Sequence, residues 1–515
     1  MNNQKLTDLL VVGGGVNGAG IARDAAGRGL SVVLCEKDDL AEGTSSRSGK
    51  LVHGGLRYLE YYEFRLVREA LIEREVLLNA ASHIIWPMRF VLPHSPNDRP
   101  AWLVRLGLFL YDHLGGRKKL PGTRMLNLRR DPEGAPVEDQ YKLGFEYSDC
   151  WVDDARLVTL NAVSAGEKGA RVLTRTECVS AMREDGAWTV ELKDVRTGNV
   201  TTIRARAICN AAGPWVNKVV GNMNTSTRRN VRLVKGSHII VPKFWEGPQA
   251  YLVQNDDKRV IFINPYEGDK ALIGTTDIPY EKKPETVVAD ESEIEYLLAA
   301  VNRYFKEKLK RTDVLETFSG VRALFDDGKG NPSAVTRDYE FDLDDQSGIP
   351  LLNVYGGKIT TFRKLSEHAL QRLVPYFPNI GGDWTRDEPL PGGEIENADF
   401  PQFIDRLRQR YPWIPRNLAL HYGRLYGART PDLIGSAKCL EDLGTHFGKQ
   451  LYAAEATYLA DKEWAQKPED VLYRRTKHGL HLSDEQKSAF SKWFEKTVAS
   501  TEQKTAETAT LMAQE

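Results

Sequence analysis

The chain has 515 residues, of which 41% are hydrophobic, so it is too long for one compact core and long enough for two or three domains. Lysine and arginine total 70 against 71 aspartate and glutamate, which excludes a bulk attraction to nucleic acid, and we expect no nucleic-acid partner. The five cysteines form no Cys-x-x-Cys pair, which argues against a zinc or iron–sulfur site and favours a reducing, cytoplasmic compartment. The first apolar run is too short for a signal peptide or a membrane span.

A glycine-rich turn near the start of the chain predicts a dinucleotide-binding fold. Residues 9–12 form a short apolar run that we interpret as a buried strand, and the turn Gly13-x-Gly15-x-x-Gly18 leads from it into a helical pattern. The glycines permit a tight turn and a close approach of the backbone to a pyrophosphate, to which the helix N-terminus offers N–H donors. The alternative is a glycine-rich turn without a ligand.

A second predicted strand, residues 31–35, ends at Glu36. A carboxylate at this distance from the glycine turn can accept hydrogen bonds from both ribose hydroxyls of a nucleotide. Glu36 therefore favours FAD or NAD over a cofactor that carries a 2′-phosphate.

Residues 101–114 form an apolar helix candidate, and a cluster of basic residues follows it: Arg117, Lys118, Lys119, Arg124, Arg129 and Arg130. An apolar helix beside a basic cluster is what an interfacial membrane anchor needs. Residues 101–130 are therefore a candidate anchor for an anionic membrane surface. The alternative is a core helix followed by a solvated basic loop.

Two later junctions return the chain to the predicted nucleotide site. Residues 205–215 form a strand that ends in a turn of small residues, and near residue 350 a strand, Gly356-Gly357-Lys358 and a helix follow one another. Three returns to one site suit an extended FAD molecule, whereas a nicotinamide dehydrogenase more often places this fold in one continuous block.

The predicted fold class is α/β, with an FAD-binding Rossmann-type domain of the glutathione-reductase and D-amino-acid-oxidase kind over residues 1–390. This domain is expected to be discontinuous, with inserted substrate-binding segments at about 85–150 and 225–345. Between about 145 and 350, WTVELKDV, HIIVPKF and RVIFINPY alternate apolar and polar residues, which predicts a mixed β-sheet over the cofactor. An all-α C-terminal domain is expected at 391–500. Residues 501–515 lack a sustained apolar face and are expected to be a disordered tail.

Further blocks carry a family resemblance: TSSRSGKLVHGGLRYLE at 44–60, GFEYSDCWVDDARL at 144–157, KGSHIIVP at 235–242, SGVRAL at 319–324 and TRDYEFD at 336–342. Through these blocks the chain resembles the aerobic, FAD-dependent glycerol-3-phosphate dehydrogenases of bacteria from about Leu9 to at least Lys477. It departs from their pattern at Gly49 (usually serine), Ala212 (threonine), Ala323 (proline) and Phe362 (tyrosine).

The resemblance implies oxidation of sn-glycerol 3-phosphate to dihydroxyacetone phosphate, with hydride transfer from C2 to N5 of FAD and reoxidation of the flavin by a membrane quinone. It also implies a homo-oligomer that docks peripherally on the cytoplasmic membrane. Three alternatives stay open: an oxidase that reduces O2 to H2O2, an amine or amino-acid oxidase of the same fold, and a catalytically silent flavoprotein.

The resemblance assigns catalytic roles to two residues. His238 is the candidate base, because a neutral imidazole titrates near physiological pH, although it could instead complete a hydrogen bond at a strand end. Arg322 is expected to stabilise the negative charge on the C2 oxygen with a permanently charged guanidinium.

Binding roles follow from the same resemblance. The candidates for the substrate phosphate are Arg57, Tyr58, Arg337 and Lys358. The candidates for the cofactor, besides the glycine turn and Glu36, are Thr44, Ser45, Ser46, Lys50, Gly213, Gly357 and Thr360. Asp149, Asp153 and Asp154 could suggest a carboxylate metal site, but they lead into a predicted helix where aspartate is a common cap, so we expect no metal.

Overall fold

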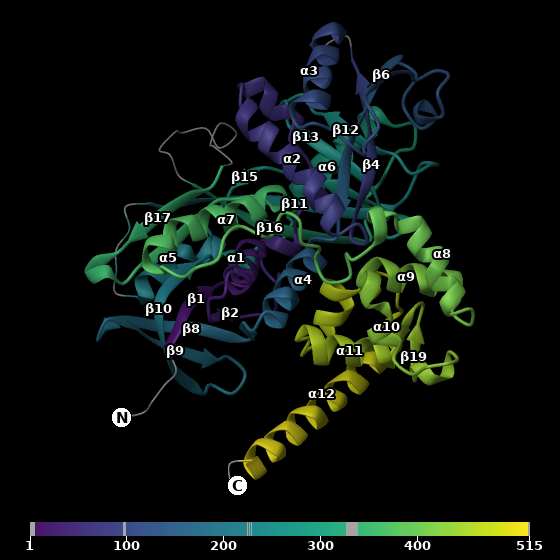
Figure 1. Ribbon diagram of the computed structural model, residues 1–515. Helices are drawn as coiled ribbons and strands as arrows, with labels where there is room; N and C mark the ends of the chain where they lie inside the picture. The colour runs from purple at the N-terminus through teal and green to yellow at the C-terminus, as the bar shows by residue number, and fades with distance from the viewer. Residues whose placement is uncertain are drawn as a thin grey trace.

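The computed structural model describes residues 6–95, 99–223, 225, 227, 229–325 and 338–512, with side chains as far as residue 499. Figure 1 shows two sheet-based parts and a group of helices built from the C-terminal residues. The termini lie on the same side of the molecule as the first sheet (Figure 1).

The first sheet forms the predicted dinucleotide-binding layer. Its main path runs β17-β18-β10-β1-β2-β7, and β10 also pairs with β9, which pairs with β8. The strands are β1 (Leu6–Val12), β2 (Val32–Cys35), β7 (Arg171–Leu173), β8 (Thr176–Glu184), β9 (Ala187–Asp194), β10 (Val200–Asn210), β17 (Glu340–Asp344) and β18 (Leu351–Tyr355). Strands β2, β1, β10 and β18 are parallel, so their carboxyl ends meet along one edge.

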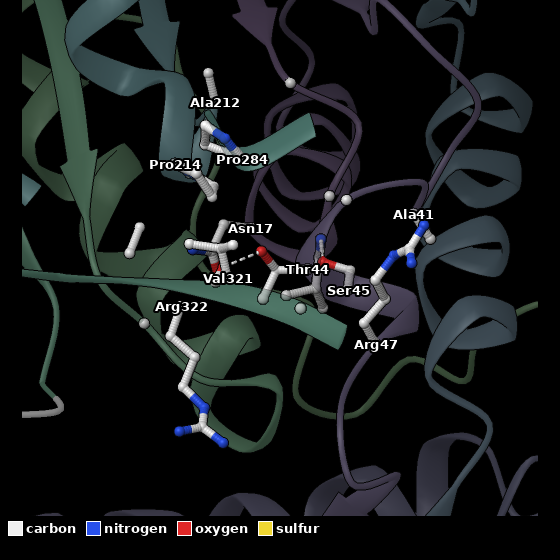
Figure 2. Close-up of a pocket in the computed structure, with 18 of the residues that line it drawn as sticks. Asn17, Ala41, Thr44, Ser45, Arg47, Ala212, Pro214, Pro284, Val321 and Arg322 are labelled. Atoms are coloured by element: carbon white, nitrogen blue, oxygen red, sulfur yellow. Dashed lines mark hydrogen bonds between the residues drawn. The ribbon is translucent and has the colours of Figure 1, made fainter. Parts of the chain in front are cut away.

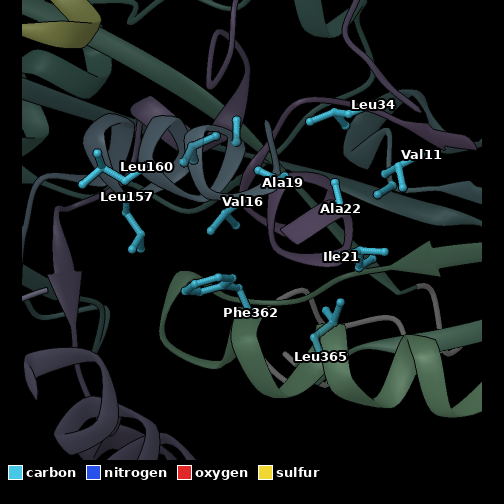
Figure 3. Close-up of a cluster of buried hydrophobic side chains, with 14 of the residues drawn as sticks. Val11, Val16, Ala19, Ile21, Ala22, Leu34, Leu157, Leu160, Phe362 and Leu365 are labelled. Atoms are coloured by element: carbon cyan, nitrogen blue, oxygen red, sulfur yellow. The ribbon is translucent and has the colours of Figure 1, made fainter. Parts of the chain in front are cut away.

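Three helices pack together on this sheet: α1 (Val16–Gly27), α4 (Asp154–Glu167) and α7 (Phe362–Leu373). Helix α1 lies between the other two, with Leu157 and Leu160 of α4 on one side and Phe362 and Leu365 of α7 on another (Figure 3). The small side chains of α1 let these helices approach closely. The start of α1, at the end of β1, is thereby fixed.

The second sheet follows the path β15-β11-β14-β13-β12-β4-β6-β3, with β16 beside β11 and β5 beside β6. Its strands are β3 (Leu51–Val52), β4 (Ile85–His94), β5 (Arg124–Asn127), β6 (Leu143–Val152), β11 (Val231–Pro242), β12 (Ala250–Gln254), β13 (Val260–Tyr266), β14 (Lys270–Gly274), β15 (Ile278–Pro279) and β16 (Glu316–Phe325). Helix α6 (Glu291–Tyr304) packs on one face, and α2 (Phe64–Ala80) and α3 (Ala101–Leu114) contribute to a separate core with β4 and β6. The sheet is mixed, as predicted.

Two strands lie in a different sheet from the one predicted. WTVELKDV, which we expected in the substrate sheet, falls mainly in β9 and pairs with β10 of the dinucleotide-binding layer. Strand β17, inside the predicted substrate segment 225–345, pairs with β18 of the same layer. The alternation of apolar and polar residues predicted the strands correctly but carries no information about which sheet they join.

The C-terminal part has its own hydrophobic core and is helical apart from a small ribbon of β19 (His446–Gly448) and β20 (Leu451–Tyr452). Its helices are α8 (Phe400–Arg410), α9 (Arg416–Tyr426), α10 (Thr430–Ile434), α11 (Ala453–Glu463) and α12 (Asp484–Met512). The expected disordered tail from residue 501 is corrected as far as Met512, because α12 continues through it and projects from the body (Figure 1). Threonine is the commonest residue of the segment, but it also contains alanine, glutamate, glutamine, lysine, leucine and methionine, which favour helix without needing an apolar face. Residues 513–515 lie outside the described part.

No helix in the described part of the chain is both long enough and apolar enough to cross a membrane.

Candidate functional site

The glycine turn joins β1 to α1 and cannot accept a side chain at Gly13 or Gly18. Gly13 has φ of 109°, and a Cβ there would lie 2.7 Å from the carbonyl oxygen of Ala211, the residue that follows the neighbouring strand β10. A Cβ on Gly18 would lie 1.9 Å from the carbonyl oxygen of Gly13. The turn therefore closes tightly on β10, and the N-terminus of α1 opens toward a cavity that Gly13 and Gly15 help to line.

Glu36 follows β2 and lies beside this turn. Its carboxylate accepts hydrogen bonds from the backbone N–H groups of Gly14, at 2.6 Å, and Asp38, at 2.8 Å. Burial raises the pKa of Glu36 to about 7, against the opposing effect of these two hydrogen bonds. The carboxylate also lines the cavity, which is where a ribose would have to reach it.

Residues from both sheets line one cavity of about 630 Å³. It brings together these predicted residues: Gly13, Gly15, Glu36, Thr44, Ser45, Gly213, Gly357 and Thr360 for the cofactor, Tyr58 and Lys358 for the substrate, and His238 and Arg322 for catalysis. Figure 2 shows Thr44, Ser45 and Arg322 around it. Thr44 donates a hydrogen bond to the carbonyl oxygen of Val321, and Ser45 accepts one from the N–H of Val16, so the segment after Glu36 ties β16 to the start of α1.

His238 lies in the middle of β11, where it pairs with Phe318 of β16. Its ring stacks on that of Phe318 with centroids 4.8 Å apart, and neither ring nitrogen has a hydrogen-bond partner among the described residues. Burial holds the pKa of His238 well below its usual value near 6.5, and the positive charges of Arg322 and Lys50 lower it further. The imidazole is therefore neutral at physiological pH and has a nitrogen available to accept a proton.

Arg322 enters the cavity from β16, on the strand next to His238. Its guanidinium donates to Asp277 at 2.7 Å and to the hydroxyl of Thr275 at 3.2 Å. These contacts hold a permanent positive charge close to the imidazole, where it can stabilise an oxyanion.

A second cationic region lies between the short helix at Leu56–Tyr61 and the turn after β18. The Lys358 ammonium lies 3.9 Å from the centre of the Tyr58 ring. Arg57 does not line the cavity: it points toward Tyr61, whose hydroxyl accepts from it at 3.4 Å. Arg337 lies outside the described residues.

Three predicted cofactor residues do not line the cavity. Gly18 acts through packing against Gly13, as described above. Lys50 is buried in an ion pair with Asp154, at 2.9 Å, and also donates to the carbonyl oxygen of Ser46. Because the ammonium of Lys50 pairs with the buried carboxylate of Asp154, Lys50 and Ser46 stabilise the loop behind the cavity and do not contact its interior.

The three aspartates of the SDCWVDD block have structural partners. Asp153 is the N-cap of α4 and accepts from the N–H of Arg156, as predicted. Asp149 accepts from Arg74 at 2.7 Å and from the hydroxyl of Tyr111 at 2.8 Å.

Sequence reasoning missed the partners that hold the predicted catalytic residues. Thr275 and Asp277 follow β14, and Phe318 lies on β16, far from His238 along the chain. The TTD sequence after Gly274 is a local signal for a polar contact. Its partner, Arg322, can be identified only from the register of β11 with β14 and β16.

A family model described as FAD dependent oxidoreductase matches residues 8–342, and one described as the C-terminal domain of alpha-glycerophosphate oxidase matches residues 384–504. The chain is 72% identical to D-erythritol 1-phosphate dehydrogenase of Brucella abortus, over 96% of this chain and 99% of that protein. It is 53% identical to aerobic glycerol-3-phosphate dehydrogenase of Escherichia coli, over 94% and 97%.

Among solved structures, the glycerol-3-phosphate dehydrogenase of Bacillus halodurans complexed with FAD matches 96% of this chain and 95% of its own, with a TM-score of 0.74 and 27% identity.

Proposed function

The chain belongs to the FAD-dependent oxidoreductase family, and from this premise we propose that it oxidises the secondary alcohol of a short polyol phosphate and passes the electrons to a membrane quinone. The cofactor is FAD. The residues present fit it: a glycine turn in which a side chain at Gly13 or Gly18 would clash, the N-terminus of α1, and the buried carboxylate of Glu36 lie at one cavity.

Glycerol 3-phosphate is the substrate that we predicted from the sequence, and the relative from Escherichia coli supports it. D-erythritol 1-phosphate is the second candidate, because the Brucella relative named for it is 72% identical over almost the whole chain. Both molecules carry a phosphate and secondary alcohols, so one arrangement of residues serves both.

The observation that carries the proposal is that a neutral histidine, a fixed arginine and a separate lysine line the same cavity as the glycine turn. Lys358 is suited to bind the phosphate and so to place the adjacent carbinol. His238 accepts the hydroxyl proton on a ring nitrogen, and Arg322 stabilises the charge that develops on that oxygen. Bound FAD supplies the acceptor for the hydride that leaves the carbinol carbon, so the alcohol becomes a ketone and the flavin is reduced by two electrons.

The proposal is tested by mixing the purified holoenzyme anaerobically with glycerol 3-phosphate or D-erythritol 1-phosphate and following the flavin absorbance. We expect the oxidised flavin band to bleach with at least one of them. A flavin that neither substrate bleaches would refute the proposal and leave the amine and amino-acid oxidases of the same fold as the alternative. Reoxidation by a short-chain quinone, compared with air, then separates a quinone-linked dehydrogenase from an oxidase.

The membrane part of the proposal rests on α3. Its apolar residues Trp102 and Phe109 are 68% and 53% exposed, and Leu106 lies exposed beside them. Exposed aromatic and aliphatic side chains on one helix, with Arg105 on that helix and Lys118 after it, are suited to insertion at an anionic lipid surface. The core-helix alternative accounts for Leu108 and Tyr111, which are buried, and for the apolar residues that pack partly buried against the same core, but it does not account for the exposed Trp102 and Phe109. The homo-oligomer stays a prediction.

A further inference from the structure

The glycines that line the cavity differ in how strongly the fold requires them. Positive φ angles require glycine at Gly13, Gly213, Gly356 and Gly357, and a Cβ would approach other atoms closer than 3.0 Å at Gly236, Gly274 and Gly320. At Gly15 and Gly43 the nearest atoms would lie at 3.1 and 3.2 Å. Gly49 differs from all of these, because it has no positive φ and a Cβ there would meet one atom within 4 Å, at an ordinary contact distance.

That one atom is Nε2 of His238, 3.7 Å from the position of the missing Cβ. A side chain at residue 49 would therefore project into the space next to the proposed base. Neither the backbone nor the packing demands a glycine here, so its effect is to leave that space open. A substrate group that continues beyond the reacting carbinol is the occupant that such a space suits.

A buried polar side chain, that of Asn264, lies behind the part of the cavity wall that Gly49 forms. Asn264 is buried on β13, on the same face of the strand as Phe262, which lines the cavity. Its Nδ2 donates to the carbonyl oxygen of Gly49 at 3.2 Å, and its Oδ1 has no hydrogen-bond partner among the described residues. Asn264 does not itself line the cavity, so it acts on a bound molecule through the Gly49 carbonyl that it holds.

We propose that the open space at Gly49, backed by Asn264, receives the end of a polyol phosphate that is longer than glycerol 3-phosphate and sets a preference for four-carbon over three-carbon substrates. This inference rests on the proposed function. A substrate held by its phosphate and oxidised at the adjacent carbon has one carbon beyond the carbinol when it is glycerol 3-phosphate, and two when it is a tetritol phosphate. The second of these carbons, with its hydroxyl, needs the room that Gly49 leaves. Asn264 is a positioning residue that holds the Gly49 carbonyl and the wall around it.

The test compares kcat/KM for D-erythritol 1-phosphate and glycerol 3-phosphate in the wild-type holoenzyme, Gly49→Ser and Gly49→Ala. We expect the wild-type protein to prefer the four-carbon substrate, and Gly49→Ser to reduce the ratio of the two kcat/KM values at least about tenfold, the discrimination that one small group in a pocket provides. Gly49→Ala should reduce it less. Gly221→Ser is the matched control, since Gly221 is exposed on α5 (Val216–Asn222) with no atom near its missing Cβ.

Asn264→Leu, which keeps the size and removes both polar atoms, should raise KM for the four-carbon substrate more than for the three-carbon one. A merely structural role would change both substrates equally. FAD content and thermal unfolding of each variant are measured alongside, and Gly49→Ala carries the test if Gly49→Ser loses its flavin.

The outcomes separate this inference from the proposed function. A wild-type flavin that neither substrate bleaches refutes the proposed function itself. A wild-type protein that prefers glycerol 3-phosphate, or a ratio that stays within twofold of wild type in both Gly49 variants, overturns the inference and leaves the proposed function standing.

Discussion

Asp39 joins the dinucleotide-binding layer to the C-terminal part through a buried ion pair network. It lies in the loop after Glu36, fully buried, and accepts hydrogen bonds from Arg474 at 2.6 Å and from Arg475 at 2.7 and 2.9 Å. We expect Asp39→Asn, which keeps the shape and removes the charge, to destabilise the protein strongly.

The size of this effect follows from the pKa of Asp39. Burial alone would raise this pKa, but Arg475 and Arg474 lower it from 3.8 to about 2. That difference corresponds to roughly 2 kcal/mol of stability for the charged over the neutral form. Because the folded pKa is the lower one, this contribution is complete above the unfolded value and is lost as the pH falls from about 4 through 2.

The assay is urea unfolding at pH 7, followed by tryptophan fluorescence, for Asp39→Asn and for the control Asp257→Asn. Asp257 pairs with Arg259 on the surface, and such pairs contribute at most about 1 kcal/mol. Asp39→Asn should lower the free energy of unfolding by roughly 2 kcal/mol and the control by much less. Equal losses in the two variants, or an unchanged stability of Asp39→Asn, would refute the reasoning.

The remaining predictions concern the cavity and the surface of α3. His238→Gln should keep its flavin and slow anaerobic flavin reduction by about 10² or more. Because burial, Arg322 and Lys50 hold the pKa of His238 well below 6.5, the rate of flavin reduction in the wild-type protein should not change between pH 6.5 and 8. A rate that titrates within that pH range would contradict the role of His238 as the base. Burial raises the pKa of Glu36 to about 7, and ribose hydroxyls favour its charged form, so FAD affinity of the apoprotein should rise from pH 6 to 8 in the wild type and be flat in Glu36→Gln, as measured by flavin fluorescence quenching. Replacing Trp102 and Phe109 together by serine should reduce cosedimentation with anionic vesicles, while serine at the exposed Val288 should not; equal retention would remove α3 from the membrane proposal.

The glycine turn and Glu36 could be predicted from the sequence because their constraints are local. The tight turn requires glycine within a few residues, and the carboxylate ends the next strand, so spacing alone identifies both. His238 and Arg322 were found through a family resemblance, since a histidine or an arginine on a strand carries no local signal of its role.

The contacts that tune these residues could not be predicted. Phe318 stacks on His238, and Asp277 holds Arg322, only because β16 and β14 lie on either side of β11 in a register that a single sequence does not reveal. Lys50 is a further example. The family resemblance predicted that it contacts the cofactor, but its ammonium forms an ion pair with Asp154, about a hundred residues away in the sequence.

The cavity has a consequence for how the protein is made. Its walls come from segments that extend from Val12 to Thr360, so the binding surface is incomplete while the ribosome is still translating the region before residue 360. At roughly 5–20 residues per second, the glycine turn waits roughly 20–70 s for its last partner strand and helix. The Arg474 and Arg475 contacts with Asp39 arrive later still. Binding of FAD is therefore a late event in biosynthesis. Cells that translate this chain faster than they supply FAD would accumulate an apoprotein with a complete cavity.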